Sequence, residues 1–442
     1  MIRENLSVCA ACLASVLVLG AAAAGAQPVP DERESGRSDP SAAGEPQPDE
    51  QSTAATPAKR KRRPKFGGPS SVAGTIRRDK GVTPLVETYF DFKERLEKDR
   101  GLEYGLDYLP IYQRASDSPG ERNAADGVVR LFARWEAVNR GTENNGALVG
   151  KLEYRHRLGT DISPQDLGPE IGYAGLTTAP FGDRGWTLPN LFWEQHLAGN
   201  RVAFVAGIVD AADYVDPYAL NDSWAHFYNQ AFATNPTIPL PAQGLGAAAR
   251  GRIGPHLYVI AGIADSNGDP TDLGDSWSSF FDTGEHFTHI ELGWVPSHER
   301  RFTDNIHLTA WHADDLEQAD VPGGQGLAFS WNRLLREKWV PFVRAGYADD
   351  GGAMWERSLS GGVGYFPRGA SDLLGVGVNW GRPSKDTFGP GLDDQYTVEI
   401  FYRWQPLRLL TISPDLQLLF DPALDPNEDL IAVLGVRIRL AL

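Results

Sequence analysis

The sequence predicts an all-β protein: a transmembrane antiparallel β-barrel of 16 strands with one short N-terminal helix. Two observations predict this fold class. Hydrophobic and polar residues alternate with a period of two over nearly all of residues 102–442, as in strands whose two faces meet different surroundings. Aromatic residues also gather near the ends of many of these runs, as side chains at a membrane–water interface do.

The first residues have the pattern of an export signal. An apolar stretch runs from about Ala10 to Ala24, and small residues continue to Ala26 before the polar Gln27. This pattern is typical of a signal peptide, residues 1–26, that is cleaved after Ala26. A retained membrane anchor is the alternative, but the stretch is short for a spanning helix and no stop-transfer pattern follows it.

Composition excludes several classes of function. Both cysteines, Cys9 and Cys12, lie in the predicted signal peptide, so disulfides, thiol catalysis and cysteine-ligated metals are not expected. The net charge of −16 disfavours nucleic acid as a partner. The chain has no zinc-protease, nucleophile-elbow or phosphate-loop motif, and we therefore expect no catalytic residue, metal or cofactor.

Residues 27–70 are predicted to form a disordered arm. They are rich in Pro, Ala, Ser, Asp and Glu and carry almost no large apolar side chains, so they cannot bury enough surface to offset the entropy of ordering. Within the arm, Lys59 to Lys65 form a basic block. We interpret this block as a solvated tether, and contact with anionic envelope polymers or lipid is the alternative.

Residues 71–101 are predicted to be a periplasmic segment that contains a helix. Pro84 suits the first turn of a helix and Gly101 suits its carboxyl-terminal cap. Between them, four apolar residues recur at helical spacing: Leu85, Tyr89, Phe92 and Leu96. The sequence therefore predicts one amphipathic helix over 84–100, and no strongly helical pattern follows it.

Residues 102–442 are predicted to be the barrel. About 17 runs of 7 to 12 residues are separated by clusters of Gly, Pro, Asn and Asp. Since bacterial barrels have even strand numbers, we expect 16. In the run 128–138, for example, Val129 and Leu131 lie on one face while Arg130 and Arg134 lie on the other.

A soluble sandwich would also alternate, so the membrane prediction depends on further features. Strands of about 10 residues match a tilted crossing of the hydrocarbon layer. The charged rows suit a water-filled lumen, and a closed barrel satisfies every backbone group in lipid. The aromatic residues predicted near strand ends are Tyr104, Tyr108, Tyr112, Trp294, Trp311, Trp331, Trp339, Tyr347, Tyr365, Trp380 and Trp404.

Two neighbouring runs carry a set of charged residues on the same side. The set is Arg130, Arg134, Glu136, Lys151, Glu153, Arg155 and Arg157. One interpretation is cross-strand ion pairing that holds the wall together. The other is a charged constriction that selects solutes in a narrow pore. Both interpretations remain open, because the same residues can do both.

Other candidate site residues lie on a strand and on the longest connection. Glu194 shares a strand face with Phe192 and His196. The connection from Asp210 to about Gly244 is rich in aromatic and amide side chains, and loops of this length are uncommon unless they are functional or disordered. It could fold inward and narrow a pore through Asp213, Trp224, Tyr228 and Asn229, or it could pack outside on its own aromatics.

The stretch 265–269 starts like a calcium-binding loop. Pro270 then stands where that motif needs Gly, and Ser276 stands where it needs a bidentate Glu. We therefore expect a turn on the outer rim and no metal site.

Several stretches of the chain resemble the carbohydrate-selective porins of the OprB type. The matching stretches include "GGPSSVAGTIRRDKG" at 67–81, "LFWEQHLAGNRVAFVAGIVDAADYVDPYAL" from Leu191 and "YTVEIFYRWQPLRLLTISPDLQLLFDPALDP" at 396–426. The resemblance implies a 16-stranded barrel with a short periplasmic helix and diffusion of monosaccharides, glucose above all. It also places the constriction at Arg130, Arg134, Glu136, Lys151, Glu153 and Arg155.

The leading hypothesis is therefore a passive outer-membrane porin for small neutral carbohydrates, with outer-membrane lipid as its surroundings. A general diffusion porin, an envelope-tethering barrel with little conductance and an outer-membrane hydrolase are the alternatives. The chain departs from the family's pattern in its acidic and then basic arm. It also ends in Leu442, where outer-membrane barrels usually have an aromatic residue.

Overall fold

A computed structural model describes Phe66 and residues 84–442 of the chain. These residues all belong to one compact unit, Arg63–Leu442. The predicted signal peptide and the predicted arm, apart from Phe66, lie outside the described residues, and so does the basic block. In the part of the chain that is described, no helix is long and apolar enough to cross a membrane.

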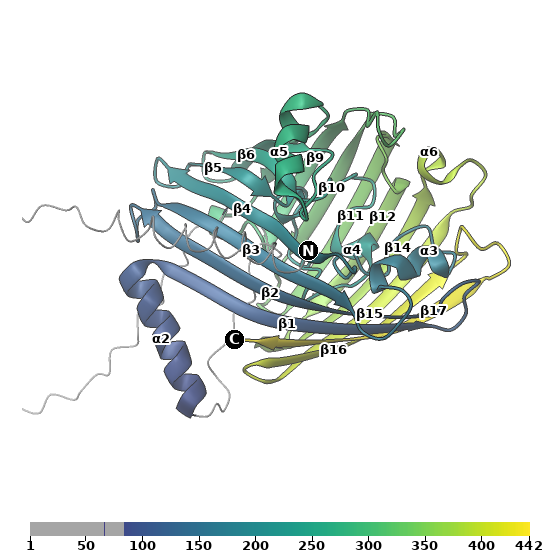
Figure 1. Cartoon of the computed structure of the whole chain (residues 1–442), viewed down its shortest axis with the longest axis horizontal. Helices are drawn as coiled ribbons and strands as arrows, with labels where there is room; N and C mark the ends of the chain where they lie inside the picture. Colours follow the sequence, from purple (N-terminus) through teal and green to yellow (C-terminus); the bar gives the residue numbers. More distant parts are fainter. Residues whose placement is uncertain (1–65, 67–83) are drawn as a thin grey trace, which may run out of the picture. The chain divides into compact units, whose positions relative to one another are not determined.

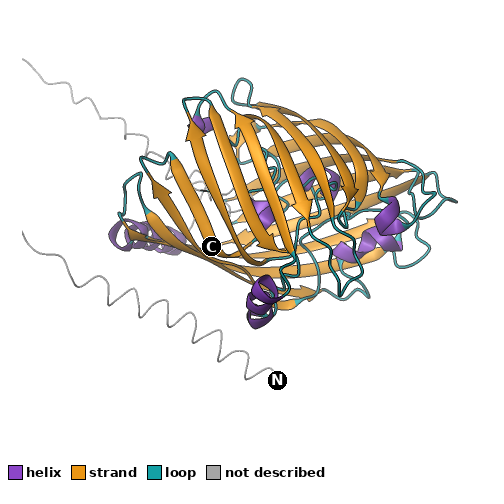
Figure 2. Ribbon diagram, turned by 90° about the horizontal axis from the view of Figure 1, so that it is seen from above, coloured by secondary structure: helices purple, strands orange, loops and turns teal. Residues whose placement is uncertain are grey.

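Sixteen antiparallel strands close into a barrel, as the sequence predicts (Figures 1 and 2). In chain order they are β1 (Leu102–Ala115), β2 (Asn123–Val138), β3 (Gly146–Arg157), β4 (Gly185–Leu197), β5 (Val202–Val209), β6 (Gly244–Ile253), β7 (Leu257–Asp265), β8 (His286–Trp294), β9 (Asp304–Ala313), β10 (Gly324–Arg333), β11 (Trp339–Asp350), β12 (Trp355–Tyr365), β14 (Leu373–Pro383), β15 (Gln395–Leu407), β16 (Leu410–Phe420) and β17 (Leu430–Ala441). A seventeenth strand, β13 (Pro367–Ala370), is short and lies outside the barrel order.

The barrel closes where its first and last strands pair. β1 runs antiparallel to β17, with Tyr112 opposite Val436. The ladder extends to the last residue, because the Leu442 N–H donates to the Leu106 carbonyl at 2.7 Å and the Leu106 N–H donates back at 3.2 Å. The non-aromatic terminal residue is thus fully paired through its backbone.

Helix α2 (Pro84–Arg100) precedes β1 and has the predicted bounds. Glu87 in its first turn and Lys98 and Arg100 in its last turn complement the helix dipole. Gly101 ends the helix with φ +73°, a conformation that Gly adopts without strain, and its N–H donates to the Glu97 carbonyl.

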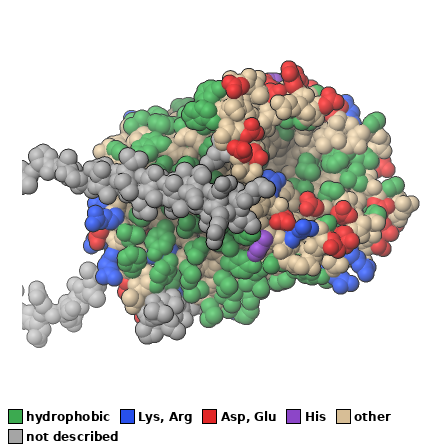
Figure 3. All heavy atoms as spheres, in the orientation of Figure 1, with side chains coloured by type: hydrophobic (Ala, Val, Ile, Leu, Met, Phe, Trp, Pro, Cys, Tyr) green, Lys and Arg blue, Asp and Glu red, His purple; other side chains and the backbone are tan. Residues whose placement is uncertain are grey.

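Successive connections lie at opposite ends of the barrel, and the three longest, 158–184, 210–243 and 266–285, all lie at the same end. The turn rim, next to α2, consists of the connections 139–145, 198–201, 254–256, 295–303, 334–338, 366–372 and 408–409. The loop rim consists of the connections 116–122, 158–184, 210–243, 266–285, 314–323, 351–354, 384–394 and 421–429. Figure 3 shows acidic side chains gathered toward the loop rim and hydrophobic side chains over much of the wall nearer α2.

The connections contain several short helices. They are η2 (Pro164–Asp166), α3 (Leu167–Glu170), η3 (Ala211–Asp213), α4 (Gln230–Ala233), α5 (Leu273–Asp282), η4 (His298–Arg300) and α6 (Lys385–Phe388). Helix α5 contradicts the expectation that nothing after α2 is clearly helical. Asp272 caps it by accepting hydrogen bonds from the N–H groups of Gly274 and Asp275.

The two faces of each strand have opposite character. Leu434 is 61% exposed on the outer face, whereas the neighbouring lumen-facing Arg437 is 2% exposed. Leu359 is 51% exposed on β12, and the next residue, Ser360, is 3% exposed. The exposed outer face is therefore apolar and the enclosed face is polar, which is the polarity of a barrel in lipid.

The predicted aromatic positions are confirmed at several strand ends, where Trp294, Trp339 and Trp404 are all more than 40% exposed. Trp311 is a wrong assignment. It is only 3% exposed and stacks on Phe287 inside the barrel, because it has the same strand parity as the lumen-facing His307.

A charge at the middle of the outer face should destabilise the barrel. We expect Leu359→Arg to lower the free energy of unfolding by about 2–4 kcal/mol, because the guanidinium would enter the hydrocarbon layer. Urea denaturation in lipid vesicles measures this change. The matched control is Leu335→Arg on the connection 334–338 of the turn rim, where the same change should cost about 0–1 kcal/mol. Equal losses at both positions would contradict the placement of β12 in lipid.

Candidate pore constriction

The longest connection, 210–243, folds into the barrel and crosses its lumen. The N–H groups of Tyr228 and Asn229 donate to the two carboxylate oxygens of Glu399 on β15 at 2.6 and 3.0 Å. Because β15 lies far from β5 and β6 in the barrel order, the connection reaches across the barrel. Figure 2 shows short helical segments enclosed by the strands.

Asp216 binds this connection to the wall at a second place. It adopts φ +51°, and its N–H donates to Glu291 Oε2 at 3.2 Å. Its carboxylate accepts from His307 Nε2 at 2.8 Å and forms an ion pair with Arg344. Burial would raise the pKa of Asp216, but Arg344 and His307 together lower it below the usual value. The group therefore stays ionised.

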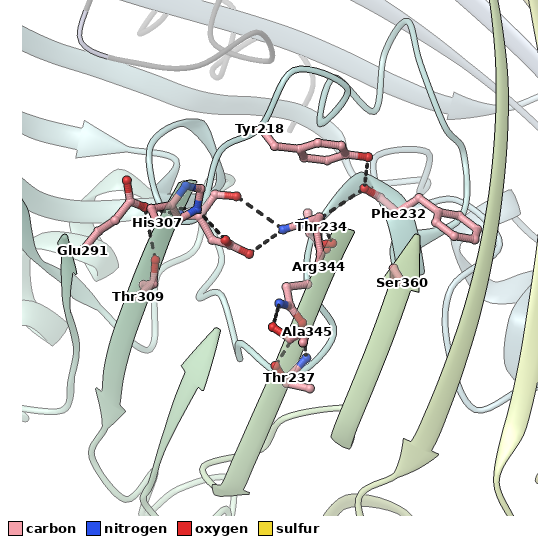
Figure 4. A network of polar contacts seen from close by, with 12 residues as sticks. Tyr218, Phe232, Thr234, Thr237, Glu291, His307, Thr309, Arg344, Ala345 and Ser360 are labelled. Carbon is pink, nitrogen blue, oxygen red and sulfur yellow. Dashed lines mark hydrogen bonds and ion pairs between the residues drawn. The ribbon is translucent and has the colours of Figure 1, made fainter. Parts of the chain in front are cut away.

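Arg344 on β11 also binds the second half of the connection (Figure 4). Its guanidinium donates to the carbonyl groups of Phe232 and Thr234 and lies 4.6 Å from the ring centroid of Tyr218. The Tyr218 hydroxyl donates to the same Phe232 carbonyl at 2.8 Å. A buried cation thus satisfies backbone groups that a lumen-crossing segment would otherwise leave unpaired.

Aromatic packing closes one side of the lumen. Phe227 packs edge-on against Phe342 of β11 and Phe401 of β15, with ring centroids 5.7 and 4.9 Å apart. The ring centroids of Phe232 and Phe227 lie 5.0 Å apart. Each of the four phenylalanines is at most 1% exposed. The connection therefore packs against β11–β15 and presents its other edge, with Trp224, to β1–β3.

Trp224 meets a group of buried charges on that opposite wall. The Arg130 guanidinium lies 4.2 Å from the Trp224 ring centroid and binds both carboxylate oxygens of Asp107 at 2.9 and 2.6 Å. Arg439 of β17 donates to the same carboxylate at 2.8 Å. On the loop-rim side, Phe181 of the connection 158–184 packs edge-on against Trp224 at 5.4 Å.

Glu153 and Arg155 of β3 complete this group. Arg155 donates to Glu153 Oε2 through two nitrogens, at 3.0 and 2.6 Å, and its guanidinium lies 5.8 Å from the Trp224 ring centroid. Glu153 is directly opposite Arg130 in the β2–β3 register. We call Asp107, Arg130, Glu153, Arg155, Arg439 and Trp224 the eyelet group.

The remaining charged residues predicted for the site form two further groups, nearer the turn rim. Lys151 forms an ion pair with Asp213 at 3.1 Å, and Asn190 of β4 also donates to Asp213 at 3.3 Å. Arg134 forms ion pairs with Glu136 and Glu194, each at 2.9 Å. The predicted residues are thus brought together as three neighbouring groups along β2 and β3, except Arg157, which forms an ion pair with Asp183 at 2.8 Å near the loop rim.

Tyr228 and Asn229 belong to the lumen connection and are bound by β16. The Tyr228 hydroxyl donates to the Ser413 carbonyl, and the Asn229 amide donates to Gln417 at 2.9 Å and caps α4. Both residues position the connection, and Tyr228 lies in the buried cluster against which Trp224 of the eyelet group packs. The predicted turn at Asp265 is present, since its carboxylate accepts from the Asn267 N–H and the Ser279 hydroxyl. No group of three or more possible metal ligands occurs among residues 66 and 84–442.

Comparisons with known proteins identify the class of barrel. Residues 323–442 match the sequence model of the family described as carbohydrate-selective porin, OprB family. This part of the chain is similar to the OprB family. The resemblance predicted from the sequence is thereby confirmed over residues 323–442. No curated protein matches the chain in sequence.

A solved structure is similar to this chain in fold over the whole barrel. The high-pH structure of Pseudomonas putida OprB covers 80% of this chain and 97% of that chain, at 14% identity and a TM-score of 0.63. The low-pH structure of the same protein has 12% identity and a TM-score of 0.49, covering 80% and 96% of the two chains. The channel DcaP of Acinetobacter baumannii has 10% identity and a TM-score of 0.47, covering 77% and 97%.

Glu399 should be required to immobilise the lumen connection of this porin. In Glu399→Gln one of the two oxygens that accept from the Tyr228 and Asn229 N–H groups becomes an amide nitrogen. We expect the attachment to weaken by roughly 1–3 kcal/mol, the cost of a buried unpaired donor. Single-channel recordings should then show more frequent current fluctuations. Glu356→Gln on β12, whose carboxylate contacts Arg357, is the matched control, and identical traces for both variants would refute this role.

Asp210, at the start of the connection, should make ion selectivity depend on pH. Burial and the neighbouring Asp213 raise its pKa to about 6, although Lys151 opposes the shift. The raised pKa means that the neutral form is favoured at low pH and that negative charge appears as the pH rises through about 6. The cation-to-anion permeability ratio, measured by reversal potentials, should therefore fall between pH 7 and pH 5.

Asp210→Asn should make that ratio constant over the same pH range. The matched control is Asp320→Asn on the exposed connection 314–323, which should keep the wild-type pH dependence. A pH dependence that persists in Asp210→Asn would assign the titration to another group.

Proposed function

We propose that small neutral carbohydrates, such as the monosaccharide glucose, diffuse passively through this porin and are selected by the eyelet group. The observation that carries the proposal is the position of Arg130, whose guanidinium binds Asp107 on one side and faces the Trp224 ring on the other. A charged donor, a charged acceptor and an aromatic face thus lie within one short stretch of the lumen.

Each part of this group suits a part of a sugar. Hydroxyl groups both donate and accept hydrogen bonds, so they can bind the guanidinium nitrogens of Arg130 and Arg155 and the carboxylate oxygens of Asp107 and Glu153. The C–H face of a pyranose ring is apolar and can pack on the Trp224 ring. A pore that lacked either kind of contact would admit polar solutes without this preference.

The charges of the eyelet group are also fixed before any solute arrives. Arg130 is tied to Asp107 by two hydrogen bonds, and Arg155 is tied to Glu153 by two more. A charged solute would compete with these pairs, whereas a neutral sugar can add hydrogen bonds without breaking them. The fixed ion pairs of the eyelet group therefore favour neutral solutes over charged ones of similar size.

The other two charged groups extend the polar wall toward the turn rim. Lys151 with Asp213, and Arg134 with Glu136 and Glu194, follow the eyelet group along β2 and β3. A series of fixed ion pairs offers a hydroxylated solute repeated, weak contacts, which allow it to leave each site as easily as it enters. Transport then follows the concentration gradient of the solute.

The route of the chain to its membrane is part of the same proposal. Cleavage after Ala26 is supported by the signal-peptide pattern of residues 1–26. Contact of Lys59 to Lys65 with anionic envelope polymers is supported only by the charge of that block.

Liposome swelling tests the selection of solutes. Vesicles containing the refolded porin should swell faster in glucose than in a disaccharide or in a charged amino acid of similar size at equal osmolarity. Trp224→Ala should lower the glucose-to-disaccharide rate ratio severalfold, because it removes an aromatic contact worth about 1 kcal/mol and widens the eyelet.

Trp277→Ala is the matched control, since Trp277 is 60% exposed on α5 and lies outside the eyelet group. It should keep the wild-type ratio. Equal wild-type rates for all three solutes would reduce the protein to a general diffusion porin. An absence of swelling from folded barrels would instead favour a tethering barrel with little conductance.

A further inference from the structure

Phe66 lies inside the barrel although it is separated by many residues from the first strand. Its side chain is 1% exposed, and its ring packs edge-on against Tyr214 with centroids 5.7 Å apart. The guanidinium carbon of Arg250 on β6 lies 5.7 Å from the centre of the same ring. Phe66 is therefore enclosed by the wall on one side and by the lumen connection on the other.

Both backbone polar groups of Phe66 are bound by charged side chains. Its N–H donates to Glu194 Oε2 at 2.9 Å, and its carbonyl accepts from an Arg301 guanidinium nitrogen at 2.5 Å. Glu194 belongs to β4, and Arg301 belongs to the connection 295–303 before β9. Charge-assisted bonds to both backbone groups, together with an enclosed ring, are the features by which a protein binds one residue of a peptide.

The residues that bind Phe66 are themselves fixed by other parts of the barrel. Glu194 Oε1 accepts from Arg134 at 2.9 Å and contacts His196 at 3.1 Å. Arg250 donates to the Asn200 side chain at 2.8 Å. Because these charges are held by the wall, the site has its shape independently of Phe66.

The position of this site matters for a channel. Glu194, Arg250 and Arg301 are each 4% exposed; Glu194 and Arg250 lie near the turn-rim ends of their strands, and Arg301 lies in a turn-rim connection. Tyr214 belongs to the lumen connection and is two residues from Asp216, which binds that connection to the wall. Phe66 thus occupies the space between the wall β4–β9 and the underside of the constriction.

We infer that Glu194, Arg250, Arg301 and Tyr214 form an intramolecular binding site for the chain's own Phe66. Bound there, Phe66 obstructs the lumen on the turn-rim side and lowers its conductance. The inference requires that the barrel conducts but not that it selects sugars, so it can fail while the proposed function holds. It also gives Glu194 a task other than contact with a passing solute.

Conductance of the full chain in planar lipid bilayers tests the obstruction. Phe66→Ala should raise the mean single-channel conductance at least about twofold, because the ring leaves the lumen and the backbone loses its enclosed site. The matched control is Phe92→Ala on α2, which removes the same ring from a residue that is 49% exposed. That control should keep the wild-type conductance.

A cross-linking measurement tests the binding directly. Both cysteines of the chain lie in 1–26, so in a chain that starts at Gln27 the double variant Phe66→Cys with Tyr214→Cys has only two thiols. A short bifunctional thiol reagent should join them in folded barrels within vesicles and lower the conductance relative to that of the untreated double variant. The pair Phe66→Cys with Trp277→Cys should not be joined, because Trp277 is exposed on α5.

The two measurements separate the parts of the inference. If the thiols at 66 and 214 do not join, Phe66 does not occupy this site and the inference fails. If they join but Phe66→Ala leaves the conductance unchanged, Phe66 binds without obstructing the pore, and the obstruction is refuted. A change of conductance with an unaltered glucose-to-disaccharide ratio would support the obstruction while leaving the solute selection at the eyelet group untouched.

Discussion

The whole structure depends on the requirement that every backbone N–H and C=O facing lipid be hydrogen-bonded within the protein. Pairing of β1 with β17 meets this requirement by removing the last two free strand edges. Closure then forces each strand to present alternate residues to lipid and to the lumen. Apolar side chains such as Leu434 occupy the outer face, and charges such as Arg437 are confined to the inner face.

Confined charges must be paired, and the way they are paired shapes the lumen. On the wall β8–β15, Glu291, Arg344 and Glu399 bind backbone groups of the connection 210–243 and hold it across the barrel. On the opposite wall, Arg130 pairs with Asp107, and its guanidinium lies against the Trp224 ring. Paired charges therefore hold the constriction in place, and they also form the surface that we propose selects solutes.

Local pattern was enough to predict the strand faces, the strand number and the bounds of α2, because each depends on residues close in sequence. The parity rule also placed Arg130 and Glu153 on one side. Arg439 was missed as a member of the site because its partner Asp107 is 332 residues away, and only closure brings the two strands together. Trp311 could have been assigned correctly, since it shares its parity with His307. Helix α5 was missed because its Asp272 cap lies in a segment that was interpreted as a turn.

The place where the barrel closes also determines how its chain could be reordered. The Lys93 ammonium of α2 donates to the carbonyl of Leu442, and Leu442 pairs with Leu106 near the start of β1. The first and last elements of the described unit therefore meet at the turn rim. A short linker could join them there, and the chain could be cut at another turn of the same rim without changing the neighbours of any strand. The order of strands along the chain is thus separable from their order around the pore.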